Sequence, residues 1–303
     1  MRGLVAAIMA VMLVAVLAYA ITAPSVLSEG GLPTHEADAT AGQQIFRAGG
    51  CASCHASPVD GKRARGADKL LLGGGMELAS GKGTFVVPNI SPHLEDGIGR
   101  WSTLDFVNAM LRGVSPDGRH YYPSFPYTSY ARMRLEDVID LKAYLDTLPE
   151  VSGGSAAHDL GFPWSLRRGI GAWKRLYFDT GFVVATAATD PLLERGRYLV
   201  EGPGHCGECH TPRNWFAALD AGRWLAGAPS PAGDGRVPNI TPAGKNVSAW
   251  SIEDIAYYFE SGFTPDFDAV GGSMVAVQEN LAQLTADDRE AIAAYLKAVP
   301  AIE

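Results

Sequence analysis

Apolar residues are arranged along this chain of 303 residues as one long uninterrupted run, followed by shorter apolar segments between polar loops. Residues 3–23 carry no charge, whereas charged side chains are interspersed from Glu29 onward. No alternating apolar and polar pattern is long enough to indicate a substantial strand. The pattern therefore predicts an all-α fold that begins with one apolar helix.

The apolar run has the length of a membrane span, since about 20 apolar residues in a helix cross a bilayer. A cleaved signal peptide usually has a shorter apolar core of about 7–15 residues. The tripeptide Ala18-Tyr19-Ala20 has the small-x-small form that signal peptidase accepts, so cleavage after Ala20 is the alternative. Arg2 predicts a cytoplasmic N-terminus and an exported remainder. We predict residues 1–27 to be a membrane anchor or signal segment.

The remainder of the chain contains one sequence pattern twice. The first copy reads AGQQIFRAGGCASCH, VPNISP, WSTLDFVNAMLRG and LEDVIDLKAYLDTLP, and the second reads RGRYLVEGPGHCGECH, VPNITP, WSIEDIAYYFESG and TADDREAIAAYLKAVP. A domain of roughly 110 residues can bury its own core. We therefore predict two tandem domains at residues 38–150 and 186–303, joined by a linker at residues 151–185.

Helix start and stop signals occur at equivalent places in the two copies. Ser102 and Ser251 each precede an aspartate by three residues, which is a variant of the capping box. Gly113 and Gly262 follow these serines at the same distance and suit the residue after a helix end. In the second copy we also expect N-caps at Asp190, before a proline, and at Thr285.

The linker between the copies contains both glycines and aromatic residues. Its glycines suit a connection, whereas Trp164, Trp173, Tyr177 and Phe178 indicate that it packs onto the domains. We favour an inter-domain strap whose aromatic residues face the core. A docking site formed by this aromatic and basic segment is the alternative.

All four cysteines of the chain lie in two Cys-x-x-Cys-His motifs, which form the attachment signature of c-type haem. Each thiol can form a thioether with one haem vinyl group, and the adjacent imidazole is then placed under the iron as the proximal ligand. The predicted attachment residues and proximal ligands are Cys51, Cys54 and His55 in the first motif and Cys206, Cys209 and His210 in the second.

Other uses of these motifs fit the sequence less well. A zinc site needs neither the adjacent histidine nor a domain of this size, and a thioredoxin-like cysteine pair would lie near a βαβ pattern, which is absent. The formal net charge of −8 argues against nucleic acid as a partner. We therefore predict two covalently bound haem c groups.

From about residue 38 onward, the chain resembles the haem-c domains of the cytochrome subunits of periplasmic alcohol, aldehyde and gluconate dehydrogenases. The resemblance is carried by both CxxCH motifs, PNIS and PNIT, the WS-x-x-D helix starts, YYPSFPYTSY and the AYL helix ends. It implies two class I cytochrome c domains that exchange electrons with redox proteins. Those subunits usually carry three haem domains, and this chain has two.

The second copy offers one methionine as a sixth iron ligand. Met274 is the only methionine in that copy and lies in the loop before the last helix, where the resemblance also places the axial methionine. A buried methionine is ordinarily core filler, but position and uniqueness favour a ligand here. Methionine ligation raises the potential of a cytochrome haem.

The first copy has no equivalent methionine, because Phe125 stands where similar cytochromes commonly have one. Met133 is our first candidate for the sixth ligand, although the equivalent residue of the second copy is Leu284, which has a core position. His120 is the second candidate and would give two imidazole ligands. An open or water-bound iron is the third alternative.

Several further side chains have two interpretations. Asn89 and Asn239 either bond near a haem edge or stabilise a turn, and Trp101 and Trp250 are interpreted as anchors of the middle helices. The tyrosines of YYPSFPYTSY are expected to wall the first haem pocket; they are Tyr121, Tyr122, Tyr127 and Tyr130.

We interpret the chain as an electron carrier without catalytic residues, anchored at the periplasmic side of the bacterial inner membrane, or periplasmic if it is cleaved. The expected partners are a dehydrogenase and a terminal oxidase or soluble cytochrome. The alternative is a dihaem enzyme such as a peroxidase, with an open first haem supplied with electrons by the second. A thiosulfate-oxidising enzyme with a cysteine-ligated haem is disfavoured, since no cysteine remains. A third class is a structural or assembly subunit of a respiratory complex.

Overall fold

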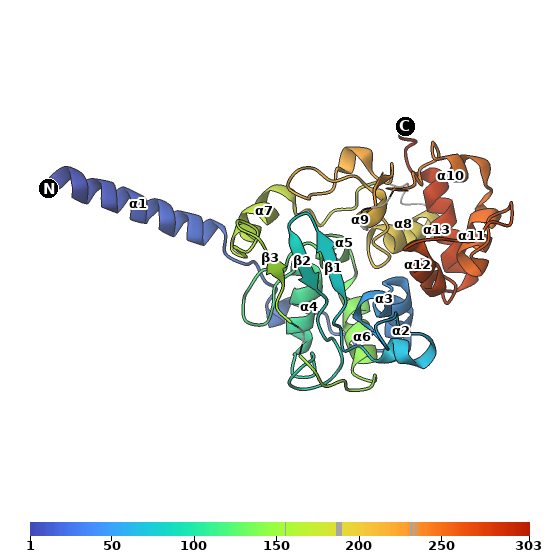
Figure 1. Cartoon of the computed structure of the whole chain (residues 1–303), viewed down its shortest axis with the longest axis horizontal. Coiled ribbons are helices and arrows are strands. Elements are labelled where there is room, and N and C mark those ends of the chain that lie inside the picture. The colour runs from blue at the N-terminus through green and yellow to red at the C-terminus, as the bar shows by residue number, and fades with distance from the viewer. Residues whose placement is uncertain (155, 186–189, 231–232, 234) are drawn as a thin grey trace.

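The computed structural model describes residues 1–154, 156–185, 190–230, 233 and 235–303. One long helix projects from a globular body made of two helical parts (Figure 1). We call residues 28–154 the first half and residues 190–303 the second half. The predicted domain boundary at residue 186 lies outside the described residues.

The projecting helix is α1 (Arg2–Ile21), which contains the apolar run. None of its residues is buried against the globular body, and its mean hydropathy of 2.8 and length of 20 residues suffice to cross a membrane. A signal sequence near an N-terminus passes the same test of length and composition. Thr22 follows the helix and begins the connection to the first half.

The first half is built from short helices and one small sheet. Its helices are η1 (Glu29–Gly31), α2 (Ala39–Ala48), α3 (Ala52–His55), η2 (Gly66–Leu70), α4 (Thr103–Arg112), α5 (Tyr127–Tyr130) and α6 (Leu135–Leu145). Strands β1 (Glu77–Ser80) and β2 (Gly83–Val86) form an antiparallel hairpin, and β3 (Asp159–Leu160) from the linker pairs antiparallel with β2.

The second half repeats this arrangement after the linker helix α7 (Gly169–Tyr177). Its helices are α8 (Pro191–Glu201), α9 (Gly207–His210), η3 (Ala221–Arg223), α10 (Lys245–Ala249), α11 (Ile252–Ser261), α12 (Met274–Leu281) and α13 (Ala286–Ala298). Strands β4 (Ala228–Pro229) and β5 (Arg236–Val237) form a two-stranded antiparallel sheet. The fold is mostly helical, and the expectation of an all-α chain was wrong for these short strands.

Each half buries its own apolar cluster. One cluster comprises residues between Ile45 and Leu148, and the other comprises residues between Tyr198 and Val299 together with Ala48. The participation of Ala48 shows that the two halves also pack against each other.

In both halves the first and last helices cross closely at a glycine. A Cβ on Gly42 of α2 would lie 1.9 Å from the carbonyl oxygen of Asp140, and a Cβ on Gly196 of α8 would lie 2.0 Å from that of Ala291. Any larger side chain would separate α2 from α6, or α8 from α13. These crossings set the position of the segment that immediately follows the first helix, which is the Cys-x-x-Cys-His motif.

The predicted helix caps are confirmed. Ser102 and Ser251 each form a capping box with the aspartate three residues later. Gly113 and Gly262 end the same helices with φ values of 59° and 78°, in the left-handed region that glycine adopts without strain. Asp190 and Thr285 accept backbone hydrogen bonds at the starts of α8 and α13.

The described part of the linker packs onto both halves, as predicted for a strap. Trp173 donates a hydrogen bond from Nε1 to the carbonyl of Phe216, 2.8 Å away, in the second half. The ring of Phe178 lies 5.6 Å from that of Tyr127 in the first half. The aromatic residues of the linker are therefore mostly structural contacts.

Candidate haem sites

Each Cys-x-x-Cys-His motif forms a single helical turn. The amide of His55 donates to the carbonyl of Cys51 at 3.0 Å, and the amide of His210 donates to that of Cys206 at 3.0 Å. Residues three and four positions apart lie on the same face of such a turn. Two thiols and an imidazole are therefore presented together at the start of each half.

The imidazoles of the two motifs are held in the same way. Nδ1 of His55 lies 2.8 Å from the carbonyl oxygen of Pro88, and Nδ1 of His210 lies 2.8 Å from that of Pro238. Because a carbonyl oxygen only accepts, Nδ1 carries the proton, and Nε2 is left as the acceptor that can bind a metal. Burial lowers the pKa of both histidines, although the carbonyl contacts oppose it, so both rings favour the neutral form.

No role for Pro88 or Pro238 follows from the sequence alone. Their signal was the repeated VPNIS and VPNIT, in which a backbone carbonyl acts rather than a side chain. The orientation of the imidazole is thus set by a loop 28 to 33 residues away in sequence.

The cysteines are chemically free for attachment. All four are unpaired, with Cys54 and Cys209 exposed and the other two half-buried. Burial raises the pKa of Cys51 and of Cys206 to about 12, so these thiols are protonated at neutral pH. Among the described residues, no group of three or more His, Cys, Asp or Glu side chains could hold a metal ion. Two thiols and one imidazole in each motif turn suit the attachment of a haem better than a closed zinc site, which takes four ligands.

The asparagines after the two prolines stabilise the loops that carry the carbonyls. Asn89 donates from Nδ2 to the carbonyl of Val151 at 2.7 Å, and Asn239 donates to that of Ile302 at 2.7 Å. The turn-stabilising interpretation is therefore confirmed. Each bond ties a proline loop to the segment that follows the last helix of its half.

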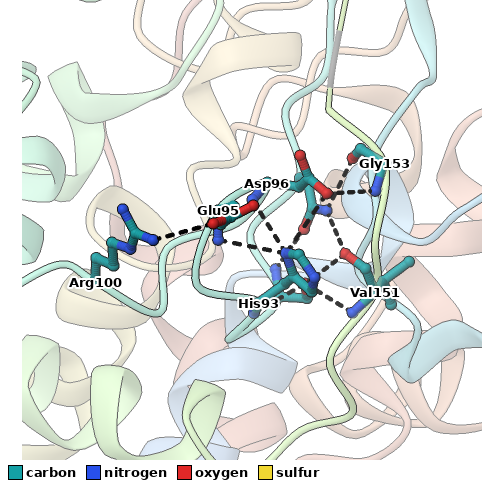
Figure 2. Close-up of polar contacts among 8 residues, drawn as sticks. His93, Glu95, Asp96, Arg100, Val151 and Gly153 are labelled. Atoms are coloured by element: carbon teal, nitrogen blue, oxygen red, sulfur yellow. Dashed lines mark hydrogen bonds and ion pairs between the residues drawn. The ribbon is translucent and has the colours of Figure 1, made fainter.

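Figure 2 shows further polar contacts in the loop that follows Asn89. Nδ1 of His93 accepts from the amide of Asp96 at 3.1 Å, and the Asp96 carboxylate accepts from the amide of Gly153 at 2.8 Å. Arg100 reaches Glu95 at 3.3 Å across the same loop. These contacts hold the part of the loop that follows Asn89.

Met133 is buried beside the first motif. It lines a small cavity together with Cys51, Tyr130 and Met110, and its backbone amide donates to the carbonyl of Tyr130 at 2.8 Å. The sequence pattern of α4 marks Met110 as an ordinary core residue and gives no sign that it lines this cavity. Gly202 of the second half also lies against Met133.

His120 is buried in a different place. Its Nε2 lies 2.9 Å from the carbonyl oxygen of Thr22, next to the end of α1, and it does not line the cavity beside Cys51. Its Nδ1 has no hydrogen-bond partner among the described residues. Burial lowers its pKa, so the ring favours the neutral form.

Phe125 belongs to an aromatic cluster in the first half. Its ring lies 5.6 Å from Tyr121, 5.7 Å from Tyr130 and 6.4 Å from Tyr127, each in an edge-to-face arrangement. Tyr130 also lines the cavity beside Cys51. Through Tyr130, this aromatic cluster borders the cavity that Met133 also lines.

Met274 is the first residue of α12 and is half-buried at the edge of the second apolar cluster. Met274 was predicted to lie in the loop before the last helix, and this prediction is wrong, because residues 274–281 form the additional helix α12. Helix α12 continues to the interface between the halves, where Asn280 donates from Nδ2 to Oγ of Ser53 at 2.8 Å.

The reciprocal contact joins the second motif to the first half. The carboxylate of Glu208 accepts hydrogen bonds from Thr128 at 2.7 Å and Ser129 at 2.9 Å, and it pairs with Arg213. Burial alone would raise the pKa of Glu208, but Arg213 and the two hydroxyl groups outweigh it, and the pKa is lowered. Ser53 and Glu208 occupy the same place in their motifs, so the haem-attachment turns face the partner half symmetrically.

Comparisons with known proteins agree with this geometry. The profile of the family described as Cytochrome c matches residues 39–149. A protein named diheme cytochrome c-type from Cereibacter sphaeroides is 54% identical over 266 residues, which cover 88% of this chain and 87% of that protein. The chain belongs to the cytochrome c family.

Family membership implies that this cytochrome carries haem c and transfers electrons. It is also similar to the fructose dehydrogenase cytochrome subunit of Gluconobacter japonicus, at 36% identity over 88% of this chain and 54% of that protein. The gluconate 2-dehydrogenase cytochrome c subunit of Pantoea cypripedii is 35% identical over 86% of this chain and 59% of that protein. This cytochrome therefore spans little more than half the length of those dehydrogenase subunits.

Proposed function

We propose that the chain is a membrane-anchored dihaem cytochrome c that carries electrons on the periplasmic side of the inner membrane. The observation that carries this proposal is the duplicated site. In each half, a Cys-x-x-Cys-His turn presents a histidine whose Nδ1 lies 2.8 Å from a proline carbonyl. Because this geometry is the same in both halves, it supports two tandem class I cytochrome c domains, each of which attaches a haem through its own motif.

The residues that we assign to each haem follow from this geometry. Cys51 and Cys54 would form thioethers with one haem and Cys206 and Cys209 with the other, and Nε2 of His55 and of His210 would bind the irons. When bound, haem c supplies a one-electron couple between ferric and ferrous iron. The chain orients the imidazoles and packs the halves so that Ser53 and Glu208 of the two motifs are each held by the opposite half.

For the sixth ligands we propose Met274 in the second half and Met133 in the first. Met133 is supported over His120, because it lines the cavity beside Cys51 whereas His120 bonds near the end of α1. A closed distal side of the first haem favours an electron carrier over a peroxidase, which needs an open iron.

A dehydrogenase is the partner that we propose on one side, because relatives are named as cytochrome subunits of fructose and gluconate dehydrogenases. On the other side we propose a terminal oxidase or a soluble cytochrome. Helix α1 would anchor the carrier close to these membrane partners.

The experiment is spectroscopy of the purified full chain in detergent, with the haem content per chain measured from the mass and from the pyridine haemochrome. We expect two haems per chain, both low-spin by magnetic circular dichroism, and no turnover of hydrogen peroxide. A first haem that is high-spin, binds cyanide and consumes peroxide would contradict the carrier and favour the dihaem peroxidase.

Paired replacements, Cys51→Ala with Cys54→Ala and Cys206→Ala with Cys209→Ala, localise the haems, because a single remaining thiol could still form one thioether. Each is expected to leave one covalent haem, in the half whose motif is intact. A chain that retains two covalent haems after either replacement would contradict the assignment of that motif.

A further inference from the structure

Helix α7 lies beside the globular end of α1, as Figure 1 shows. The guanidinium of Arg168 donates to the carbonyl of Tyr19 at 2.6 Å and to Oγ1 of Thr22 at 3.0 Å. Arg175 donates to the carbonyl of Ile21 at 3.2 Å. These bonds satisfy carbonyls at the end of α1 that have no partner within the helix. They hold α7 at the level where α1 ends.

The segment that contains α7 is basic, although the whole chain is acidic. Residues 160–178 include three arginines and one lysine and no aspartate or glutamate, whereas the chain has a formal net charge of −8. Cationic side chains at the end of a membrane span are attracted to anionic lipid headgroups.

Large apolar side chains are exposed beside these cations. Leu166 and Leu176 of the linker are 58% and 74% exposed, and Trp215 and Phe216 of the second half are 84% and 52% exposed. Phe216 adjoins α7, because its ring stacks on that of Tyr177 at 6.2 Å. Exposed aromatic and aliphatic residues with arginines at the level of a span end are the composition of an interfacial surface.

We propose that these residues form a membrane-facing surface that lies in the headgroup layer of an anionic bilayer. The membrane-facing surface consists of Leu166, Arg168, Arg175, Leu176, Trp215 and Phe216. This inference rests on the proposed anchoring by α1. Anionic phospholipid is the occupant, because Arg168 and Arg175 lie at the end of the span and the exposed apolar side chains lie in or beside the segment that carries these arginines.

The membrane-facing surface has a consequence for both haem sites. Helix α7 bonds to the first half, where Lys174 donates to the carbonyl of Gly113 at 2.8 Å, and to the second half through Trp173 and Phe216. A bilayer that holds α7 would therefore fix the orientation of the whole globular body relative to the membrane.

The test uses the full-length holoprotein in vesicles of phosphatidylcholine and phosphatidylglycerol at a 3:1 ratio. Single cysteines are introduced as Leu176→Cys in the membrane-facing surface, Val11→Cys in α1 and Tyr257→Cys on the exposed side of α11, and the rates of modification by a polyethylene glycol maleimide are compared. The parent holoprotein, in which all four native cysteines are assigned to thioethers, provides the background rate of modification.

We expect Leu176→Cys to react at least five-fold more slowly than Tyr257→Cys, and Val11→Cys to be protected. A protected Val11→Cys with a Leu176→Cys as fast as Tyr257→Cys would overturn the membrane-facing surface and leave the anchor intact. A reactive Val11→Cys would instead contradict the anchoring itself. If the protection of Leu176→Cys is lost when the protein-to-lipid ratio is lowered, the surface is covered by a second copy of the chain and not by lipid. That result would overturn the proposal.

The charge requirement is tested in the Leu176→Cys background. The added pair Arg168→Gln and Arg175→Gln is expected to restore modification at least three-fold in these vesicles while Val11→Cys stays protected. The matched control Arg223→Gln, an exposed arginine of η3, should change nothing. Equal rates in the double variant and its parent would overturn the role of anionic headgroups.

Discussion

Single residues distinguish the two Cys-x-x-Cys-His sites from each other more than the motifs do. The proximal sides are matched, since His55 and His210 both lie 2.8 Å from a proline carbonyl. The residues expected on the distal sides differ, since Met274 begins a helix in one half while Phe125 occupies an aromatic cluster in the other. Under the proposed function, a sulfur ligand for the first haem has to come from a different position.

The first prediction concerns that ligand. Replacing Met133 by leucine is expected to convert one of the two haems from low-spin to high-spin, because leucine preserves the packing but cannot bind iron. Magnetic circular dichroism of the ferric protein measures the change. Met110→Leu is the matched control, since Met110 lines the same cavity and should leave both haems low-spin. A high-spin haem in Met110→Leu alone would reassign the ligand.

The second prediction concerns Lys174, whose burial lowers its pKa from 10.5 to about 7. Its Nζ donates to the carbonyls of Arg112 and Gly113, in the first half. Between pH 7 and 10.5 the unfolded chain then binds more protons than the folded chain, so the free energy of unfolding rises with pH. One proton contributes at most about 1.4 kcal/mol per pH unit.

Denaturant unfolding in detergent at pH 7.5 and 9.5 measures this slope. Lys174→Met is expected to flatten it, whereas Lys245→Met, at an exposed position of α10, should leave it unchanged. An unchanged slope in Lys174→Met would show that other groups cause the pH dependence.

Helices place the haem motifs through their closest crossings. Helices α2 and α8 each precede a Cys-x-x-Cys-His turn, and each crosses the last helix of its half at a glycine. The crossing leaves no space for a side chain, so the position of each motif relative to its half is fixed by backbone contact.

The third prediction tests this crossing. A Cβ on Gly196 would lie 2.0 Å from the carbonyl oxygen of Ala291 and 2.7 Å from Cβ of Tyr295. Overpacking costs typically about 1–3 kcal/mol, and the better helix propensity of alanine offsets about 1 kcal/mol of it. Gly196→Ala is therefore expected to lower the free energy of unfolding by up to about 2 kcal/mol, measured by denaturant titration.

Gly271→Ala is the control for that substitution, since a Cβ at Gly271 meets no atom within 4 Å. It should change stability by less than about 0.5 kcal/mol. Equal effects of the two substitutions would show that the α8–α13 crossing is not tight.

The whole molecule is organised by contacts that relate the two halves symmetrically. Ser53 bonds to Asn280 of the second half, and Glu208 bonds to Ser129 of the first. Arg132 of the first half also lies 3.7 Å from the buried carboxylate of Glu201 in the second. The linker also contacts both halves, through Trp173 and Phe178. The halves therefore act as one body and not as two tethered domains.

The fourth prediction tests the interface through Glu208. Its removal leaves Arg213 and the hydroxyl groups of Thr128 and Ser129 without their shared acceptor. Unsatisfied buried polar groups cost about 1–3 kcal/mol. Glu208→Ala is expected to lower the free energy of unfolding by about that amount, and the exposed Glu290→Ala to leave it unchanged.

Haem spectra distinguish a loss of the interface from a loss of the second motif. Covalent attachment to Cys206 and Cys209 should persist in Glu208→Ala, with the denaturation midpoints of the two halves separated. A single unchanged transition would contradict the role of Glu208 in joining the halves.

The sequence by itself determined the features that depend on local chemistry. The two haem motifs, the caps at Ser102 and Ser251 and the stops at Gly113 and Gly262 are set by residues close together in the chain, and all the caps and stops are confirmed. The apolar pattern also predicted an all-α fold, and the observed fold is mostly helical. Periodicity missed the short strands because each pairs over only two to four residues, too few for an alternating pattern.

Only the tertiary structure decided which distant atoms meet at each site. The carbonyls of Pro88 and Pro238 orient the histidines, and a backbone group leaves no side-chain signal in a sequence. The same holds for the position of His120 beside Thr22, of Met133 beside Cys51, and of α7 beside α1. These placements depend on how helices cross and halves pack, and those contacts join residues that are far apart in the chain.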